Sequence, residues 1–335
     1  MVHDWFHALT GFHEHSHADT RSRLALDGQV LRSTVTQQAY RIGTLETPSL
    51  ADLRGHAGQA PTSLGGRLRV ATVTADAVSL HRDPANHGAL FQVASQFNLL
   101  EMTGPHVIPE HGVARYAHDH TQGPACAIAA GAATIYRNYL VPVDGQPGQT
   151  RDRQIDCLRD MGQALGNHDG ALWTMQNGYA LCSKRGLAAI GERLAAASAA
   201  ERDALRDRLR IGVHWDVQVT GIPRTDLTVS QAFCSALPVS YTDVPAAAWE
   251  PFARLVLEGA YEATLWGAVL NARRGGSRVV YLTLLGGGAF GNDPAWIHDA
   301  IRRALTLVRD VALDVRLVSY RGPSAEVRRL VAEFA

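Results

Sequence analysis

Residues 279–320 read VVYLTLLGGGAFGNDPAWIHDAIRRALTLVRDVALDVRLVSY and decide the expected fold. Residues 279–285 form a run of leucine, tyrosine and β-branched residues of strand length, which is typical of a buried strand. Residues 293–308 begin with Asp-Pro, a common helix start, and then repeat apolar residues at three- and four-residue spacing. Residues 315–320 predict another strand. This order of strand, loop, helix and strand predicts an α/β fold.

The loop between the first strand and the helix, GGGAFGN at residues 286–292, is rich in glycine. Glycine leaves the backbone uncovered, so the amides of residues 286–289 can point together at a ligand in front of the helix. Helix N-termini attract anions, and the loop therefore predicts a site for a phosphate or pyrophosphate. The alternative is a tight connection that binds nothing.

A nicotinamide-dinucleotide site is a further alternative, because residues 286–291 match the GxGxxG pattern. Such a site needs an acidic residue at the end of the second strand, where this chain has Ser-Tyr-Arg at residues 319–321. It also needs further strand–helix units downstream, and the sequence stops at residue 335. A nicotinamide-dependent oxidoreductase is therefore the less favoured interpretation.

Composition disfavours several classes of function. The 335 residues are 46% hydrophobic, enough for a large core, and Lys plus Arg equals Asp plus Glu at 32 each. Because the net charge is zero, neither a nucleic acid nor an anionic membrane is an expected partner. There is no apolar run of membrane-spanning length and no secretion signal, and the four cysteines are widely spaced. These features predict a cytoplasmic protein.

Three histidines near the start, His13, His15 and His17, alternate and would share one face of a strand. No nearby cysteine or carboxylate pair completes a metal site, so no metal is expected.

The chain divides at about residue 64. Residues 1–64 mix aromatic, histidine and turn-forming residues and predict an N-terminal extension that packs on the core. Residues 65–335 predict one α/β domain, in which residues 69–74 and 77–80 are expected as strands and residues 89–95 as a buried strand. An Asn-Gly pair at residues 177–178 predicts a hairpin.

Polar residues follow the expected strand at residues 89–95, namely Asn98 and Glu101, together with the aromatic Phe97. In an open α/β sheet ligands collect at the carboxyl ends of strands, so these side chains are expected to line a pocket. The alternative is that they only pack and cap.

A second polar segment leads into an alanine-rich helix after Pro124. Asp119, Thr121 and Gln122 precede this helix and predict another anion-binding helix mouth. Asp119 could instead simply cap the turn.

The expected strand at residues 211–220 carries Asp216 in its interior. Burying a carboxylate without a partner is costly. Asp216 is therefore expected either to be exposed on an open face or, as the preferred interpretation, to look into a cleft with His214 and Asp226 as further polar lining.

Several segments in order along the chain carry a resemblance to a known family. They are SQFNLLE, DHTQGPACA, YRNY, HWDVQVT, FCSALPV and GGGAFGN. Together, over residues 65–320, they resemble the macrodomain-like arginine ADP-ribosylhydrolases of the MavL type. The resemblance implies a macrodomain-like mixed central sheet flanked by helices, with an N-terminal extension and insertions. It also implies cleavage of the N-glycosidic bond between ADP-ribose and arginine on a modified protein, such as ADP-ribosylated ubiquitin, with ADP-ribose as ligand or product and no required cofactor.

The same resemblance implies roles for individual residues. The glycine loop would hold the diphosphate and the adjoining ribose, with Phe290 stacked on that ribose. A loop at residues 112–116 would cover the diphosphate from the other side. The implied ligand-binding residues are Phe97, Asn98, Gly112, Val113, Tyr116, Thr121, Gln122, Gly287, Gly288, Ala289, Phe290, Gly291 and Asn292.

Carboxylates would carry the chemistry. The reaction passes through a cation-like ribose, which carboxylates stabilise while they orient water, and Glu101 and Asp119 are the candidates. A guanidinium leaving group pairs with a fixed carboxylate through two hydrogen bonds, and Asp216 with Asp226 suits that role. A protein that binds ADP-ribose without cutting it is the alternative, since it needs the loops but not the acids.

Overall fold

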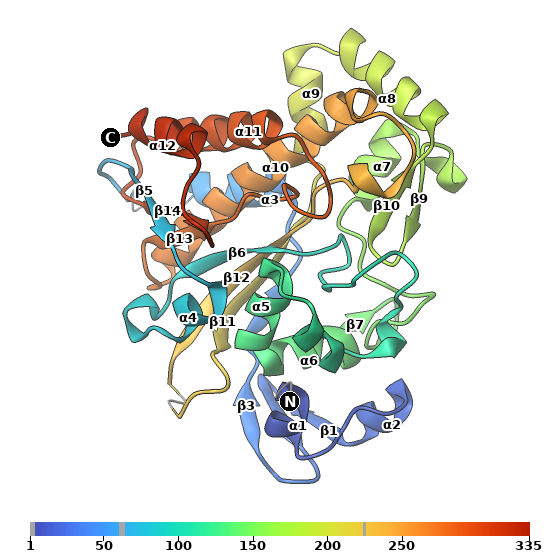
Figure 1. Cartoon of the computed structure of the whole chain (residues 1–335), viewed down its shortest axis with the longest axis vertical. Helices are drawn as coiled ribbons and strands as arrows, with labels where there is room; N and C mark the ends of the chain where they lie inside the picture. Colours follow the sequence, from blue (N-terminus) through green and yellow to red (C-terminus); the bar gives the residue numbers. More distant parts are fainter. Residues whose placement is uncertain (1–3, 60–63, 224–225) are drawn as a thin grey trace.

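A seven-stranded sheet crosses the middle of the molecule, seen here in a computed structural model that describes residues 4–59, 64–223 and 226–335 (Figure 1). Every neighbouring pair from β12 to β5 is parallel, whereas β11 is antiparallel to both of its neighbours. The predicted mixed α/β sheet flanked by helices is confirmed. Across the sheet the strands are β4 (Thr44–Glu46), β11 (Gly212–Gln218), β12 (Thr228–Cys234), β6 (Leu90–Ala94), β13 (Val279–Leu282), β14 (Asp314–Ser319) and β5 (Arg69–Thr74).

Helices cover both faces of this sheet (Figure 1). On one face the long α10 is buried over most of its length and packs against its neighbours in the main hydrophobic core. The helices of this face are α10 (Ala246–Arg273), α11 (Pro294–Leu307), α3 (Leu50–Gln59) and α12 (Ala325–Ala332). Those of the other face are α4 (Ala77–Arg82), α5 (Gln122–Ala129) and α6 (Gly131–Tyr139).

The segment at residues 279–320 folds as its sequence predicts, into β13, α11 and β14. Asp293 caps α11 by accepting a hydrogen bond from the Ala295 amide at 2.7 Å. Residues 77–80, expected in a strand, form α4 instead. The carboxylate of Asp76 accepts from the Ser79 amide at 2.9 Å, and this N-cap favours a helix over an extended chain.

The predicted N-terminal extension supplies parts of the core. Its β4 forms one edge of the central sheet, and α3 packs against α10. The rest packs against α6 in a separate apolar cluster. It comprises α1 (Trp5–Thr10), α2 (His17–Ser22), β1 (Leu24–Asp27), β2 (Val30–Ser33) and β3 (Ala39–Arg41), the three strands forming a small sheet.

A further lobe lies between α6 and β11 in the sequence. The predicted hairpin at residues 177–178 is present, with both turn residues at positive φ. A Cβ at Gly178 would lie 2.6 Å from Gln96, so the hairpin tip packs against the loop after β6. The lobe contains β7 (Pro142–Val143), β8 (Gln146–Pro147), α7 (Arg159–Leu165), β9 (Trp173–Gln176), β10 (Tyr179–Cys182), α8 (Lys184–Ala196) and α9 (Ala199–Arg206). The short 3-10 turns of the chain's described part are Pro84–Asn86, Pro109–His111, Ala114–His118, His168–Gly170 and Val239–Tyr241.

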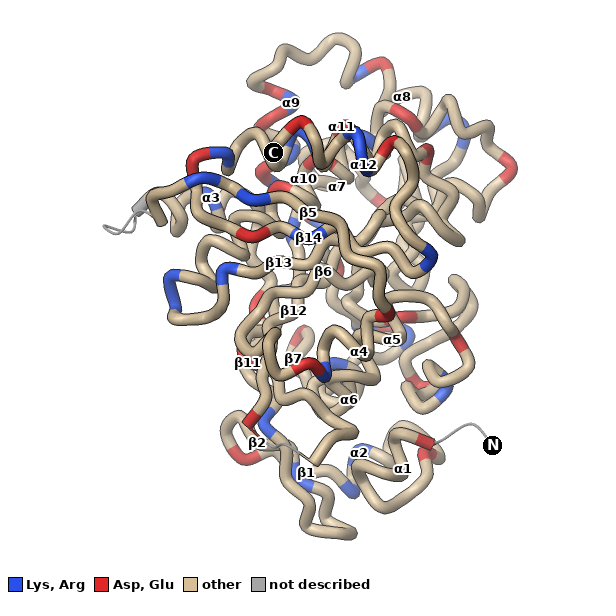
Figure 2. The backbone as a smooth tube through the Cα atoms, turned by 60° about the vertical axis from the view of Figure 1, so that its left-hand side comes forward, with Lys and Arg blue, Asp and Glu red and all other residues tan. Residues whose placement is uncertain are grey.

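Charged residues of both signs are spread over the molecule (Figure 2). Across the described ranges, the structure contains no helix long and apolar enough to cross a membrane.

Candidate functional site

Two adjoining cavities form one cleft at the carboxyl ends of β6 and β13. We name the first, of about 310 Å³, the glycine-loop cavity, and the second, of about 220 Å³, the Tyr320 cavity. Thr121, Gln122 and Thr283 line both, so the two cavities meet at these residues. The glycine-loop cavity is lined by residues 94–96, 101–103, 119, 121–124, 179, 236, 241, 283–286 and 288–290. The Tyr320 cavity is lined by residues 75–77, 80, 91, 92, 120–122, 125, 281–283, 318 and 320.

The cleft opens where two neighbouring strands part. β6 and β13 pair over two residues of each strand, starting at Leu90 and Val280. Beyond this point the side chain of Gln122, from the first turn of α5, takes the place of a neighbouring strand. Its Oε1 accepts from the Ala94 amide at 2.9 Å, and its Nε2 donates to the Gln92 carbonyl at 2.8 Å. Gln122 therefore satisfies the backbone of β6 where β13 turns away.

The glycine loop uses its glycines for two different purposes. Gly286 and Gly291 have φ of 76° and 71°, and a Cβ on them would lie 2.4 Å from Ala236 and 1.8 Å from Ser240. These two glycines are required by the turn itself. Gly288 is different, because a Cβ there would have nothing within 4 Å, and this residue lines the cavity.

The loop presents uncovered amides to the cleft. Gly287 donates its amide to the Leu284 carbonyl at 3.1 Å. Within the described part of the chain, the amides of Gly288, Ala289 and Phe290 have no hydrogen-bond acceptor. Consecutive free amides of this kind form a concave donor surface that suits a phosphate. Phe290 lies in the cavity wall.

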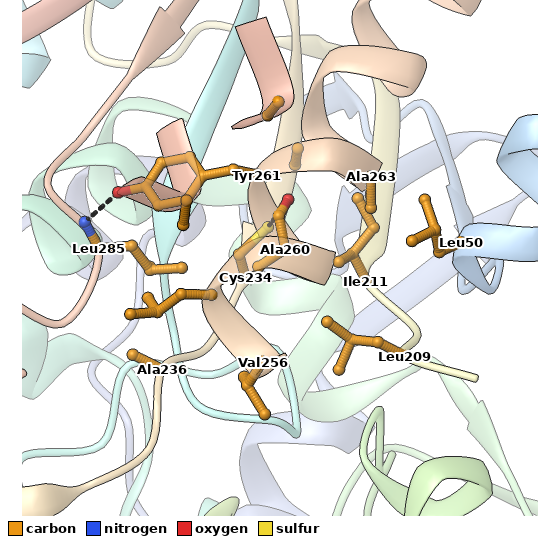
Figure 3. Packing of buried hydrophobic residues seen from close by; sticks show 14 of the residues in the cluster. Leu50, Leu209, Ile211, Cys234, Ala236, Val256, Ala260, Tyr261, Ala263 and Leu285 are labelled. Carbon is orange, nitrogen blue, oxygen red and sulfur yellow. Dashed lines mark hydrogen bonds between the residues drawn. The ribbon is translucent and has the colours of Figure 1, made fainter. Parts of the chain in front are cut away.

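The base of the glycine loop is fixed from α10. The Tyr261 hydroxyl donates to the Thr283 carbonyl at 2.7 Å and accepts from the Leu285 amide at 2.8 Å, as the dashed line in Figure 3 shows for Leu285. Tyr261 is fully buried among the apolar residues of α10. At the far end of the loop, the buried Asn292 donates to the Leu237 carbonyl at 2.8 Å. Asn292 therefore supports the loop from behind.

Glu101 is a buried carboxyl group that lines the glycine-loop cavity. Neither of its oxygens has a hydrogen-bond partner among the described residues. The Arg137 guanidinium is nearby, with Nη2 at 3.6 Å from Oε1. Burial raises the pKa of Glu101 to about 8, although the positive charge of Arg137 opposes the rise. Burial therefore favours the neutral form of this acid.

Arg137 also fixes the turn that carries Glu101. It is fully buried, its guanidinium lies 3.9 Å from the centre of the Phe233 ring, and its Nε donates to the Leu99 carbonyl at 3.1 Å. Leu99 has φ of 64°, a conformation that non-glycine residues adopt rarely. Arg137 therefore supports a strained turn directly before the acid.

Asp119 is half-buried and lines the same cavity. Its Oδ1 accepts from the Thr121 amide at 2.9 Å, so it also stabilises the turn before α5. The negative charge of Asp119 is close enough to add to the rise in the pKa of Glu101. The structure thus brings together Glu101, Asp119, the start of α5 and the glycine loop.

Phe97 and Asn98 do not line either cavity. Phe97 is buried in the main core, and Asn98 donates to the Gln154 side chain at 2.8 Å and accepts from the Leu100 amide at 3.1 Å. The structure therefore does not bring these two predicted ligand-binding residues to the cleft, because the chain reverses after Gln96, where the Leu99 amide donates to the Gln96 carbonyl.

The predicted second loop, residues 112–116, also lies outside the cleft. Its amides do bind an anion, but the anion is internal: the carboxylate of Glu14 accepts from Val113 at 2.9 Å and Ala114 at 2.7 Å. A Cβ at Gly112 would lie 2.3 Å from Glu14. The expectation that this loop covers a diphosphate is therefore wrong. Tyr116 is buried below it.

Asp216 and Asp226 lie at the other end of the sheet. The Asp216 amide donates to the Ser230 hydroxyl, and Ser230 pairs with Leu90, the first residue of β6. The cleft instead follows the last residue of β6, at the opposite end of the strand. A bulge between His214 and Val217 turns the Asp216 side chain outward, where it lies 3.6 Å from Arg274 and is about half exposed. Asp226 precedes β12 at this same end. The preferred interpretation of both as cleft residues is wrong.

His214 is fully buried and lines neither cavity.

Sequence reasoning missed several residues of the cleft. Thr283 and Tyr320 follow the strands β13 and β14, so the rule that ligands gather at strand carboxyl ends could have found them. Tyr241 carries no such sequence signal, because it reaches the cavity from the 3-10 turn Val239–Tyr241 after β12. In residues 4–59, 64–223 and 226–335 no group of three or more His, Cys, Asp or Glu side chains could hold a metal ion.

Neither a protein-family model nor a curated protein sequence matches this chain. Among solved structures, it is similar to poly(ADP-ribose) glycohydrolase from Thermomonospora curvata, with 13% identity, a TM-score of 0.46, and 95% of this chain and 97% of that chain covered. A mutant poly(ADP-ribose) glycohydrolase from Deinococcus radiodurans in complex with ADP-ribose gives 13% identity, a TM-score of 0.45, and coverage of 87% and 94%.

Proposed function

We propose that this protein hydrolyses the glycosidic bond between ADP-ribose and an arginine side chain of a modified protein. The observation that carries the proposal is the buried Glu101 carboxyl group, which has no hydrogen-bond partner among the described residues, in a cavity also lined by residues 288–290 with their free amides. An acid held neutral beside an anion site suits cleavage of a bond next to a phosphorylated sugar. No cofactor is needed for this chemistry.

The shape of the cleft fits the parts of ADP-ribose in order. The Tyr320 cavity contains the exposed Tyr320 ring and the Asp76 carboxylate, which suit the face and the amino group of adenine. The amides of residues 288–290 suit the diphosphate, and the space between Phe290 and Glu101 suits the second ribose. Residues shared by both cavities would lie beside the middle of the ligand.

In the proposed step, water adds to the anomeric carbon of this ribose as the bond from that carbon to the arginine nitrogen breaks. The electron pair of the broken bond goes to the nitrogen, which takes the proton of Glu101. The Glu101 carboxylate then takes a proton from the water and is restored. Asp119 stabilises the positive charge that develops on the ribose.

Arginine as the leaving group is supported by the charge of the cavity. Among the described residues that line the glycine-loop cavity, two are acidic and none is Lys, Arg or His. A guanidinium would meet Asp119 without a competing cation. The proposed substrate is a protein that carries ADP-ribose on an arginine, such as ADP-ribosylated ubiquitin.

The first test is calorimetry with ADP-ribose, NAD, AMP and ATP, on the natural protein and on Gly288→Ala. A methyl group at Gly288 has room in the fold but enters the cavity, so ADP-ribose should bind at least about tenfold more weakly with little change in thermal stability. Equal affinity in the two proteins would contradict the proposed diphosphate site.

The second test is turnover of a protein that carries ADP-ribosylated arginine. Loss of the label from the protein supports hydrolysis. Tight retention of the modified protein without loss of the label would instead identify a reader of ADP-ribose.

A further inference from the structure

Glu14 occupies a socket built for a carboxylate, outside the cleft. The segment that carries it lies between α1 and α2. Its two oxygens accept from the amides of Val113 and Ala114, and Oε1 also accepts from the Tyr139 hydroxyl at 2.8 Å. Gly112, with φ of 81°, leaves the space that the carboxylate fills. Charge-assisted bonds to two amides and a hydroxyl make this contact stronger than a surface ion pair.

The socket is the start of a segment that reaches the cleft. The 3-10 turn Ala114–His118 begins at the amides that Glu14 holds. Within this turn, the Tyr116 hydroxyl accepts from the Glu101 amide at 3.0 Å. The turn ends at Asp119, whose amide donates to the Tyr116 carbonyl at 3.1 Å. Both acids of the cleft are therefore fixed to the segment that Glu14 caps.

We propose that Glu14 is a positioning residue for hydrolysis: by holding residues 112–119, it fixes Glu101 and Asp119 in the geometry that turnover requires. This inference rests on the proposed function. It gives the N-terminal segment a part in catalysis, although within residues 4–59 no side chain lines either cavity.

A purely structural role makes a different prediction. If Glu14 only attached α1 and α2 to α6, its loss would lower stability and leave the turnover number of the folded protein unchanged. If Glu14 positions the acids, the turnover number falls while ligand affinity stays, because the amides of residues 288–290 and the Tyr320 cavity do not touch the socket.

The experiment compares Glu14→Ala with the natural protein on ADP-ribosylated arginine. We expect kcat to fall roughly 10- to 100-fold, with KM and the ADP-ribose Kd within about twofold. Asp19→Ala is the matched control, because Asp19 lies close to Glu14 in the sequence, in α2, but pairs with Arg23. An unchanged kcat in Glu14→Ala would overturn the inference.

Chemical rescue makes the test specific for the carboxylate. The Glu14→Ala substitution removes the carboxylate and leaves the two amides and the Tyr139 hydroxyl without their acceptor. Formate is small enough to enter the space that the carboxylate leaves. Added formate should restore a large part of kcat, whereas chloride at equal ionic strength should not. Recovery of thermal stability with formate but no recovery of kcat would also overturn the inference.

Hydrogen exchange separates failure of this inference from failure of the proposed function. The amides of Val113 and Ala114 should exchange faster in Glu14→Ala, and formate should slow them again, whether or not the natural protein turns over the substrate. If the natural protein shows no turnover, the proposed function fails. If the exchange of residues 113–119 does not change, the positioning inference fails on its own.

Discussion

Replacing Glu101 by glutamine should remove turnover and stabilise the fold at the same time. Glutamine keeps the shape of the side chain but has no proton to give. A general acid contributes about 10²- to 10⁴-fold to a rate, so kcat on ADP-ribosylated arginine should fall by about that factor. In the natural protein kcat should decline as the pH rises through about 8, where Glu101 loses its proton.

The gain in stability follows from the pKa of Glu101. Its ordinary value of 4.5 holds in the unfolded chain, and the folded value is about 8. Between these values the folded protein binds more protons than the unfolded chain, so Glu101 lowers the free energy of unfolding as the pH rises. Each pKa unit corresponds to about 1.36 kcal/mol, which gives a penalty on the order of 3 kcal/mol at pH 7. Glutamine carries no such penalty.

Urea unfolding of both proteins at pH 5 and pH 8 measures this effect. The advantage of Glu101→Gln should grow by roughly 3–4 kcal/mol between the two values, because other titrating groups cancel in the difference. Glu192→Gln, on the exposed side of α8, is the control and should show no growth. Parallel stability profiles for Glu101→Gln and the natural protein would refute the account of a buried neutral acid, as would full turnover in the variant.

Three further predictions concern Tyr320, Asp216 and Arg54. Tyr320→Ala should weaken ADP-ribose binding by roughly 1–2 kcal/mol in calorimetry and leave ribose-5-phosphate binding unchanged; equal losses for both ligands would contradict an adenine role. Asp216→Ala should retain full turnover in a label-release assay, because its carboxylate lies at the far end of the sheet; a large loss would contradict the described cleft. Arg54→Ala should lower the urea stability by roughly 1–3 kcal/mol, because the buried Glu262 loses Arg54 at 2.6 Å and keeps, among the described residues, only Arg303 as a cationic partner; stability within about 0.5 kcal/mol would contradict this.

Local sequence was sufficient to predict the glycine loop and the acid after β6. The loop lies between a strand and a capped helix, and each of these has its own periodicity or cap within a few residues. Glu101 was found because it follows a buried strand. In both cases the residues that determine the local structure lie within a few positions of one another in the sequence.

The mistakes concern long-range partners. The amides of residues 113 and 114 have the geometry of an anion site, but their anion, Glu14, comes from a segment about 100 residues earlier. Asp216 was misplaced because a bulge reverses the face of one residue, and no strand pattern records a bulge. Tyr241 lines the cleft from a short 3-10 turn, Val239–Tyr241, which follows the end of β12. Such contacts depend on the assembled fold.

The hydrogen bonds between the Gln122 side chain and the backbone of β6 have a consequence for ligand binding. These hydrogen bonds keep β6 and β13 apart in the ligand-free protein, so the cleft is preorganised for binding. Little conformational entropy is then lost on association, and free and occupied forms should superimpose closely around the first turn of α5. A small molecule that mimics the diphosphate should therefore diffuse into crystals of the ligand-free protein without damaging the lattice.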